Sequence, residues 1–156
     1  KDVDGLNNDS MFAPCTPEGV VYILKKELGN LEGKTALIIG RGKLVGKPLF
    51  DLLLQENCTV TMAHSKTKNL ESMLQYYDIV VVAAGKPKLV DLQKCNAQIV
   101  IDVGVNRVDG KLCGDCYNFD DSLNEDMLVT PVPKGIGLMT RAMLMKHIAE
   151  INQKEV

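Results

Sequence analysis

The chain has 156 residues, of which 46% are hydrophobic and 24% are charged, and its formal net charge at pH 7 is −2. This composition is typical of a soluble globular protein, and the length corresponds to one domain with a sizeable core. The slight negative charge argues against nucleic acid or an anionic membrane as the main partner, and no apolar run approaches the roughly 18 residues of a membrane span.

The five cysteines are odd in number and scattered, which is not the pattern of a disulfide framework. Cys113-Gly-Asp-Cys116 has no second pair, and the chain holds two histidines, so we expect reduced thiols and no metal site. Reduced thiols and the lack of a visible signal peptide favour the cytoplasm, or the mitochondrion if the source is eukaryotic. The start at Lys1 rather than at Met favours a fragment of a longer protein.

The first helix is predicted from Thr16, which can cap it, with Pro17 at the first helical position. Apolar residues then recur at helical spacing, and Gly29 ends the pattern. Upstream of this helix, Asp2 and Asp4 lie in a charged segment whose composition alone indicates a solvated loop.

The most informative stretch begins with Thr35–Ile39, an uncharged run that predicts a short strand buried on both faces. Gly40, Gly42 and Gly46 follow, and Pro48 then opens a helical run. A strand, a glycine turn and a helix in this order present unpaired backbone N–H groups to a phosphate. We assign the tight turn to Gly40, ligand approach to Gly42 and close packing to Gly46. The spacing G-x-G-x-x-x-G is one residue longer than the usual dinucleotide fingerprint, so the alternative is a plain turn.

The segment after the next strand, Thr59–Ala63, decides which cofactor is expected. A carboxylate there would bind the ribose diol of NAD, but the sequence continues with His64-Ser-Lys-Thr67. Ser65 can donate a hydrogen bond to a 2′-phosphate, and Arg41 adds a guanidinium from the glycine turn. The pattern therefore favours NADP over NAD. The alternative is that this segment only begins the following helix.

Three more apolar runs predict strands, and an Asp-Gly pair between apolar positions predicts a hairpin. In chain order these elements are a helix at 69–75, strands at 78–85 and 98–103, a hairpin at 107–112, a strand at 127–130, a Pro/Gly loop at 131–137 and a helix at 139–153. Leu144, Ile148 and Ile151 share one face of that last helix, with Met145 at its edge.

Strands that alternate with helices predict an α/β fold of the Rossmann type, doubly wound, with a mainly parallel sheet and helices on both faces. The carboxyl ends of the strands then meet at one edge, where open α/β sheets bind ligands. Gly40, Ser65, Gly85 and Val105 are expected at this edge. The loop at 131–137 would form a roof over the reacting end of a cofactor.

Several strings occur together in a particular order: Lys1-Asp-Val-Asp-Gly5, Pro14-Cys-Thr-Pro17, Gly40-Arg-Gly-Lys-Leu-Val-Gly-Lys-Pro48, His64-Ser-Lys-Thr67, Val100-Ile-Asp-Val-Gly-Val-Asn106 and Thr130-Pro-Val-Pro-Lys-Gly-Ile-Gly-Leu-Met-Thr140. With them, the chain resembles the C-terminal NAD(P)-binding domain of the bifunctional methylenetetrahydrofolate dehydrogenase/methenyltetrahydrofolate cyclohydrolase family over nearly its whole length. The resemblance implies an enzyme of one-carbon metabolism and purine biosynthesis. Such enzymes oxidise 5,10-methylenetetrahydrofolate with NADP, hydrolyse the 5,10-methenyl product to 10-formyltetrahydrofolate, and are usually dimers.

The resemblance also implies site residues. Five positions would hold NADP: Gly40, Arg41, Gly42, Ser65 and Val105. Asp4 would bind the pterin ring, and the junction of folate and nicotinamide would be lined by Val132, Pro133, Gly135, Gly137 and Thr140. No catalytic residue is expected in this chain, because the family's catalytic Lys and Tyr belong to an N-terminal domain. Three positions depart from the family, which usually has Ser, Gly and Pro where this chain has Gly42, Lys134 and Leu138.

Three parts are therefore expected: residues 1–15 as a linker from a missing N-terminal catalytic domain, 16–137 as the Rossmann domain, and 138–156 as a helix that returns to the N-terminal domain. The expected partners are a tetrahydrofolate derivative, the missing domain and a second copy in a homodimer. Two alternatives stay open. One is a catalytically degenerate binding or dimerisation domain, and the other is another two-domain NADP dehydrogenase of the shikimate dehydrogenase type.

Overall fold

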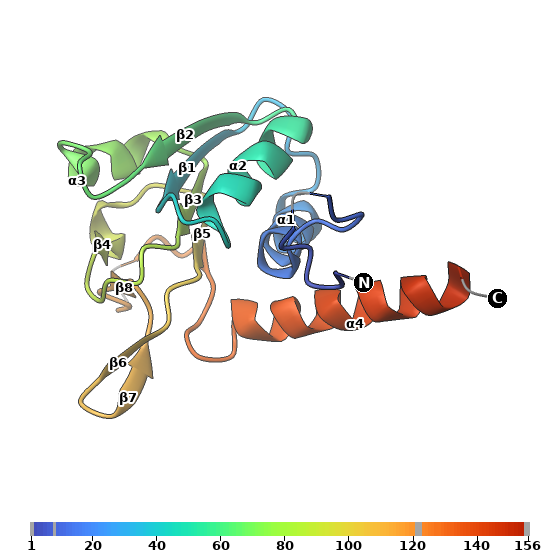
Figure 1. The fold of residues 1–156 in the computed structure, drawn as a ribbon. Coiled ribbons are helices and arrows are strands. Elements are labelled where there is room, and N and C mark those ends of the chain that lie inside the picture. The colour runs from blue at the N-terminus through green and yellow to red at the C-terminus, as the bar shows by residue number, and fades with distance from the viewer. Residues whose placement is uncertain (1, 8, 121–122, 155–156) are drawn as a thin grey trace.

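A computed structural model describes residues 2–7, 9–120 and 123–154. Its centre is a five-stranded parallel sheet in the order β2-β1-β3-β5-β9 (Figure 1). The strands are β1 (Thr35–Ile39), β2 (Thr59–Ala63), β3 (Ile79–Val82), β5 (Ile99–Asp102) and β9 (Leu128–Val129). Helices lie on both faces, so the predicted Rossmann-type fold is confirmed. Residues 1 and 8 of the predicted linker 1–15, and residues 155 and 156 of the predicted C-terminal segment 138–156, lie outside the described residues.

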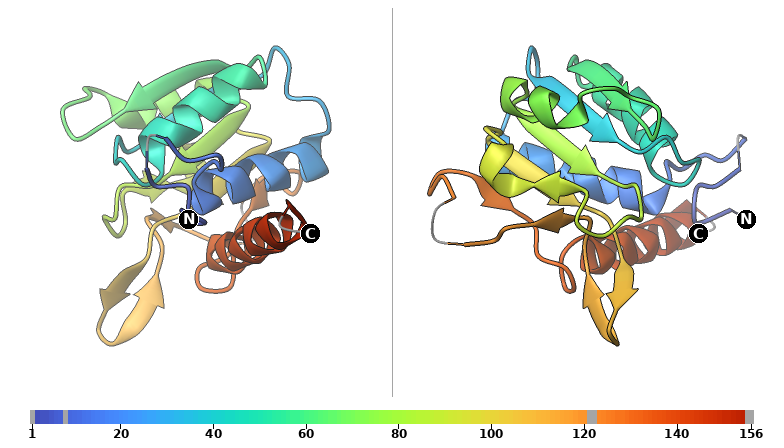
Figure 2. Two further views of the ribbon diagram at one scale, coloured as in Figure 1. Left: turned by 45° about the vertical axis from the view of Figure 1, so that its right-hand side comes forward. Right: turned by 90° about the vertical axis from the view of Figure 1, so that its left-hand side faces the viewer.

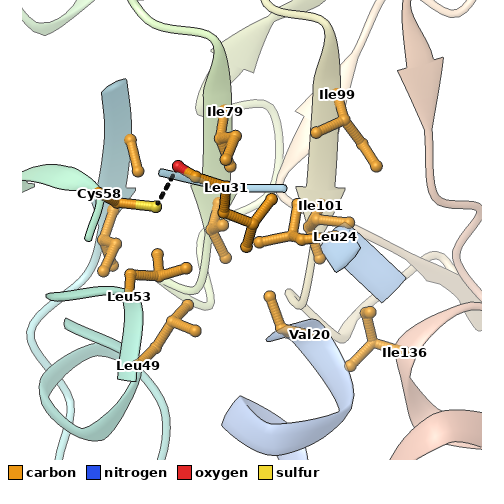
Figure 3. Packing of buried hydrophobic residues seen from close by; sticks show 13 residues of the cluster. Val20, Leu24, Leu31, Leu49, Leu53, Cys58, Ile79, Ile99, Ile101 and Ile136 are labelled. Carbon is orange, nitrogen blue, oxygen red and sulfur yellow. Dashed lines mark hydrogen bonds between the residues drawn. The ribbon is translucent and has the colours of Figure 1, made fainter. Parts of the chain in front are cut away.

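One face of the sheet packs against two long helices, α1 (Cys15–Leu28) and α2 (Gly46–Gln55). Side chains alternate along a strand, so every second residue of β1, β3 and β5 points to this face. Figure 3 shows this cluster, where Val20 and Leu24 of α1 and Leu49 and Leu53 of α2 approach the strand residues. These four helix residues have no exposed surface, and the residues of β1, β3 and β5 that face them are buried and apolar as well.

The other face is covered by short elements rather than by long helices. They are α3 (Leu70–Met73), the 3₁₀ turns η1 (Leu74–Tyr76) and η2 (Leu92–Lys94), and a parallel pair formed by β4 (Val90–Asp91) and β8 (Cys116–Tyr117). The single helix predicted at 69–75 is therefore α3 followed by η1, and Asn69 precedes it in a left-handed conformation. The pair β4 and β8 was not predicted, because two-residue strands carry no measurable periodicity.

Both long helices near the sheet begin earlier than predicted. Thr16 does not cap α1, because its hydroxyl lies 2.9 Å from that of Thr140, and the helix begins at Cys15. Likewise α2 begins at Gly46 rather than at Pro48. Each proline is the third residue of its helix, where its missing N–H would have had no partner inside the helix. The predicted end of α1 is confirmed, since Gly29 follows it with a positive φ of 73°.

The last helix, α4 (Ile136–Lys154), begins three residues before its predicted start and packs along α1 (Figure 2). Met143 and His147 of this helix are buried, whereas Ile148, on the predicted apolar face, is 38% exposed. The predicted hairpin is confirmed as the antiparallel strands β6 (Asn106–Val108) and β7 (Lys111–Cys113), which project from the body of the molecule. Within the described residues, no helix is long and apolar enough to cross a membrane.

Candidate functional site

The carboxyl ends of the parallel strands form one edge of the sheet, and the loops that follow them hold the predicted site residues. Gly40 follows β1 and donates its N–H to the carbonyl of Ala63 at the end of β2 over 2.9 Å. The loop after β3 begins at Ala83, whose N–H donates to Ile39 over 2.8 Å. Adjacent strand ends are thus tied to one another, and the edge is the place where such sheets bind ligands.

The glycine turn after β1 separates structural glycines from an open one. Gly40 has a φ of +124°, and a Cβ there would lie 2.2 Å from the carbonyl oxygen of Ala83. A Cβ on Gly46 would lie 2.0 Å from the carbonyl oxygen of Gly40, so the start of α2 lies directly against the turn. Gly42 has no atom within 4 Å of its Cβ position. Gly42 and Arg41 are both exposed, so a ligand can reach the backbone there.

The turn after β2, His64-Ser-Lys-Thr67, presents two polar side chains. Ser65 and Lys66 are exposed, whereas His64 and Thr67 are half-buried and bonded to each other. No carboxylate occurs in this turn. The side chains available to a ligand here are a hydroxyl and an ammonium, which suit a phosphate better than a ribose diol.

Two buried carboxylates hold the middle of the edge, and the sequence analysis missed both. Asp115 is fully buried, and its Oδ2 accepts from the N–H groups of Ala84 (2.9 Å) and Gly85 (2.8 Å). Its Oδ1 accepts from the N–H of Lys86 and from the Asn106 side chain, each at 2.8 Å. A carboxylate wrapped by three consecutive backbone N–H groups fixes the loop after β3, in the way that such concave backbones hold anions.

Asp102 ends β5, and its carboxylate accepts hydrogen bonds from backbone groups that include that of Asp115 itself. Its Oδ1 accepts from the N–H groups of Gly104 (2.9 Å) and Asp115 (3.1 Å), and its Oδ2 accepts from Cys116 (2.9 Å). A Cβ on Gly114 would lie 2.0 Å from Oδ2 of Asp102, and one on Gly104 would lie 2.2 Å from the Asp115 carboxyl. The sequence held one signal that could have indicated Asp102: it is an Asp at the end of a buried apolar run. Gly104 and Gly114, which lie against the two carboxylates, were a second, weaker signal.

A cavity of about 360 Å³ lies beside the roof loop. Six of its lining residues are predicted site residues: Val105, Val132, Pro133, Gly135, Gly137 and Thr140. Gly135 is required there, because a Cβ would lie 2.2 Å from the carbonyl oxygen of Pro131. Lys134 and Arg141 also line the cavity, so two cations accompany its apolar walls. The loop and the start of α4 therefore bring the predicted substrate residues and Val105 together.

Asp4 is exposed and does not line this cavity. Its backbone carbonyl accepts from the N–H of Cys15 over 3.3 Å, which attaches the N-terminal segment to the start of α1. The Asp4 residue is thus held near α1 with its surface open to solvent, and its role at a pterin ring stays a prediction.

The N-terminal segment, α1 and α4 meet at His147, another residue that the sequence analysis missed. Its Nδ1 lies 2.8 Å from the carbonyl oxygen of Val3, its Nε2 lies 2.6 Å from Glu18, and its ring stacks on Phe12 at a centroid distance of 4.3 Å. Burial would raise the pKa of Glu18, but hydrogen bonds from Lys146 and His147 outweigh it and lower that pKa. The partners lie far apart in sequence, so no local pattern indicated this junction.

The cysteines are free thiols, and burial raises the pKa of Cys15, Cys58, Cys95 and Cys116. A thiol with a raised pKa is a poor nucleophile at neutral pH. Among residues 2–7, 9–120 and 123–154, no group of three or more His, Cys, Asp or Glu is arranged to hold a metal ion. Arg41 and Lys66 are exposed cations at this edge.

Comparison with known proteins identifies a family and several relatives of this chain. Residues 14–156 match the family described as tetrahydrofolate dehydrogenase/cyclohydrolase, NAD(P)-binding domain. The bifunctional protein FolD of Bacillus cereus (strain G9842) is 46% identical over 162 residues, which cover 96% of this chain and 56% of that protein. The chain therefore spans little more than half the length of the curated relatives it matches.

Solved structures of enzymes from the same family superpose on this chain. The bifunctional enzyme FolD, a methylenetetrahydrofolate dehydrogenase/cyclohydrolase from Campylobacter jejuni, superposes with a TM-score of 0.90 at 38% identity, over 100% of this chain and 59% of that one. The Trypanosoma brucei N5,N10-methylenetetrahydrofolate dehydrogenase-cyclohydrolase, complexed with NADP cofactor and inhibitor, gives a TM-score of 0.82 at 32% identity, over 99% and 55%.

Proposed function

We propose a function from one premise: the chain belongs to the tetrahydrofolate dehydrogenase/cyclohydrolase family, as its NAD(P)-binding domain. We infer that it binds NADP and forms one side of a site that oxidises 5,10-methylenetetrahydrofolate to the 5,10-methenyl form. The same site would hydrolyse that product to 10-formyltetrahydrofolate. The observation that carries the proposal is the glycine turn, whose structural glycines are shielded while Gly42 stays open beside Arg41.

The cofactor contacts follow from this turn. A pyrophosphate would lie against Gly40 and Gly42, where the start of α2 supplies N–H groups and a positive dipole end. The 2′-phosphate would lie between Arg41 and Ser65, and the nicotinamide end would reach Val105, which is 70% exposed. The lack of a carboxylate after β2 supports NADP over NAD.

The substrate would enter beside the roof loop. The 360 Å³ cavity is lined by Val132, Pro133, Gly135, Gly137 and Thr140 together with Val105. This proximity supports a junction of folate and nicotinamide at the roof. Asp4 would complete the folate contacts from the N-terminal segment, as the family resemblance implies.

The catalytic residues would come from an N-terminal domain outside these 156 residues, in line with the 56% of the relative's length that the match covers. Residues 1–15 would lead in from that domain, and 138–156 would return to it. An apolar stripe on α4 supports the return: Leu138, Met145 and Ile148 are 51%, 66% and 38% exposed, and they recur at helical spacing.

We also propose a homodimer in the cytoplasm. The β6–β7 hairpin projects from the body (Figure 1), and its side chains Val108 and Leu112 are each 42% exposed. Two exposed apolar side chains on a projecting hairpin are suited to contact a second copy.

Isothermal titration of the chain with NADP, NAD and tetrahydrofolate tests this function. We expect NADP to bind more tightly than NAD, and Arg41→Ala to weaken NADP binding while leaving NAD binding nearly unchanged. Lys26→Ala, which removes an exposed cation from α1, is the matched control and should change neither affinity. An absence of any nucleotide binding would contradict the proposal and favour a non-catalytic scaffold.

A turnover assay tests the second part of the proposal. The chain alone should oxidise 5,10-methylenetetrahydrofolate very slowly or not at all, because the groups that transfer protons must lie within hydrogen-bond reach of the substrate and would belong to the N-terminal domain. Normal turnover by the 156 residues alone would show that the catalytic residues lie within them.

A further inference from the structure

The turn after β2 is closed by three hydrogen bonds, and His64 takes part in all of them. The backbone N–H of His64 donates to Thr67 Oγ1 over 2.9 Å, and the N–H of Thr67 donates to the carbonyl of His64 over 2.9 Å. The third bond uses the ring, since the N–H of Lys66 donates to His64 Nδ1 over 3.1 Å. The imidazole thus acts as a built-in acceptor for its own turn.

This third bond fixes the state of the ring. A backbone N–H can donate to Nδ1 only when Nδ1 carries no proton, so the neutral ring has its hydrogen on Nε2. The bond from residue i+2 to the side chain of residue i is the geometry that Asn and Asp adopt in Asx turns. His64 therefore restricts the backbone at Ser65 and Lys66, and the side chains of these two residues are exposed to solvent.

The turn is also coupled to the glycine turn. Ala63, the residue before His64, accepts the N–H of Gly40 over 2.9 Å, and Arg41 follows Gly40 directly. A fixed backbone at Ser65 and Lys66 consequently holds the points from which their side chains extend in a set place relative to the glycine turn that carries Arg41. Three groups that suit a phosphate are in this way carried on two turns that share a hydrogen bond.

We propose that His64 is a positioning residue for NADP selectivity, acting through Ser65 and Lys66 rather than by touching the cofactor. This inference rests on the proposed NADP binding. Without the Nδ1 acceptor, the N–H of Lys66 turns to water and the turn samples other conformations. The 2′-phosphate then meets groups that are no longer held ready, which lowers its affinity. NAD has no 2′-phosphate and loses little.

The test compares the affinities of the chain for NADP and NAD, by isothermal titration, in the wild type and three variants. His64→Ala removes the ring acceptor, and we expect it to lower the NADP/NAD affinity ratio about tenfold, in keeping with the loss of one hydrogen bond that orders the site. Thr67→Val removes the hydroxyl acceptor from the other side of the turn and should also lower the ratio. His64→Asn places Oδ1 near the position of Nδ1 and should restore the ratio to within about twofold.

Rescue by Asn separates positioning from a general structural role. If His64→Ala leaves the NADP/NAD affinity ratio unchanged, whether or not both affinities fall, His64 does not position the phosphate contacts. If His64→Asn is as unselective as His64→Ala, the acceptor at Nδ1 is not what matters. A wild type that binds neither nucleotide would instead overturn the proposed function, and the inference with it. Thermal unfolding of each variant checks that the fold is retained.

Discussion

Replacing Asp115 with Asn is the sharpest test of how the binding edge is built. The change keeps the size of the side chain and exchanges one carboxylate oxygen for an amide NH₂. In the wild type, four donors surround the fully buried carboxylate: the N–H groups of Ala84, Gly85 and Lys86 and the side chain of Asn106.

An amide offers one acceptor oxygen. In its best orientation, the amide of the Asp115→Asn variant keeps the two bonds from Ala84 and Gly85, and its NH₂ then faces two other donors. Two hydrogen bonds to a charged acceptor are lost, at about 1.5–3 kcal/mol each. Relief of the buried charge offsets part of this loss, so we expect a destabilisation of about 3 kcal/mol. A typical domain is stable by about 5–15 kcal/mol, so Asp115→Asn should fold but be markedly weakened.

Urea unfolding of the wild type, Asp115→Asn and Asp126→Asn measures the effect. Asp126 is exposed, and its replacement should change the free energy of unfolding by less than about 0.5 kcal/mol. With a slope of about 1–3 kcal/mol per molar urea, the Asp115 variant should unfold at about 1–3 M less urea. A midpoint equal to that of the control would refute the view that this carboxylate holds the loop after β3.

Three further predictions concern the glycine turn and the junction of α1 with α4. Gly40→Ala should unfold at a clearly lower temperature than Gly42→Ala, because its Cβ would lie 2.2 Å from a carbonyl oxygen whereas Gly42 has open space; equal melting temperatures would contradict the assigned roles. Gly42→Ser should tighten NADP binding about three- to tenfold in titrations by adding one hydroxyl contact, and unchanged affinity would mean that no phosphate lies there. The pKa of Glu18 is lowered on folding, so the stability that it contributes is fully present above its ordinary pKa of 4.5 and is lost as the pH falls through the lower folded value. The difference in unfolding free energy between wild type and Glu18→Gln should therefore shrink in acid, and a difference that grows below pH 4.5 would show the wrong sign.

The sheet could be predicted because its strands carry the information within themselves. A strand buried on both faces must be apolar throughout, as Ile79–Val82 is, and such runs stand out between polar turns. Helix starts were less accurate, since Pro17 and Pro48 are tolerated anywhere in a first turn and not only at its first position. The short pair β4 and β8 depends on pairing between distant residues, which no local pattern encodes.

The candidate site also contains features that a local sequence pattern encodes and features that depend on distant residues. The glycine turn was predictable because a positive φ or a close backbone approach leaves a glycine in the sequence, as at Gly40. The carboxylate of Asp115 was not, because its donors belong to a loop about 30 residues away and an isolated Asp also suits any surface turn. His147 was missed for a similar reason, since its partner Glu18 lies 129 residues earlier.

Four of the five residues that would hold NADP differ in exposure from the groups that support them. Arg41, Gly42, Ser65 and Val105 are exposed. The groups that shape the same edge, such as Asp115, are buried and hydrogen-bonded. Exposed contact residues on a hydrogen-bonded backbone are expected on one side of a binding site whose other side would be formed by the ligand and a second domain. If Arg41, Gly42, Ser65 and Val105 hold the cofactor, an N-terminal domain joined to these 156 residues should change turnover far more than it changes NADP affinity.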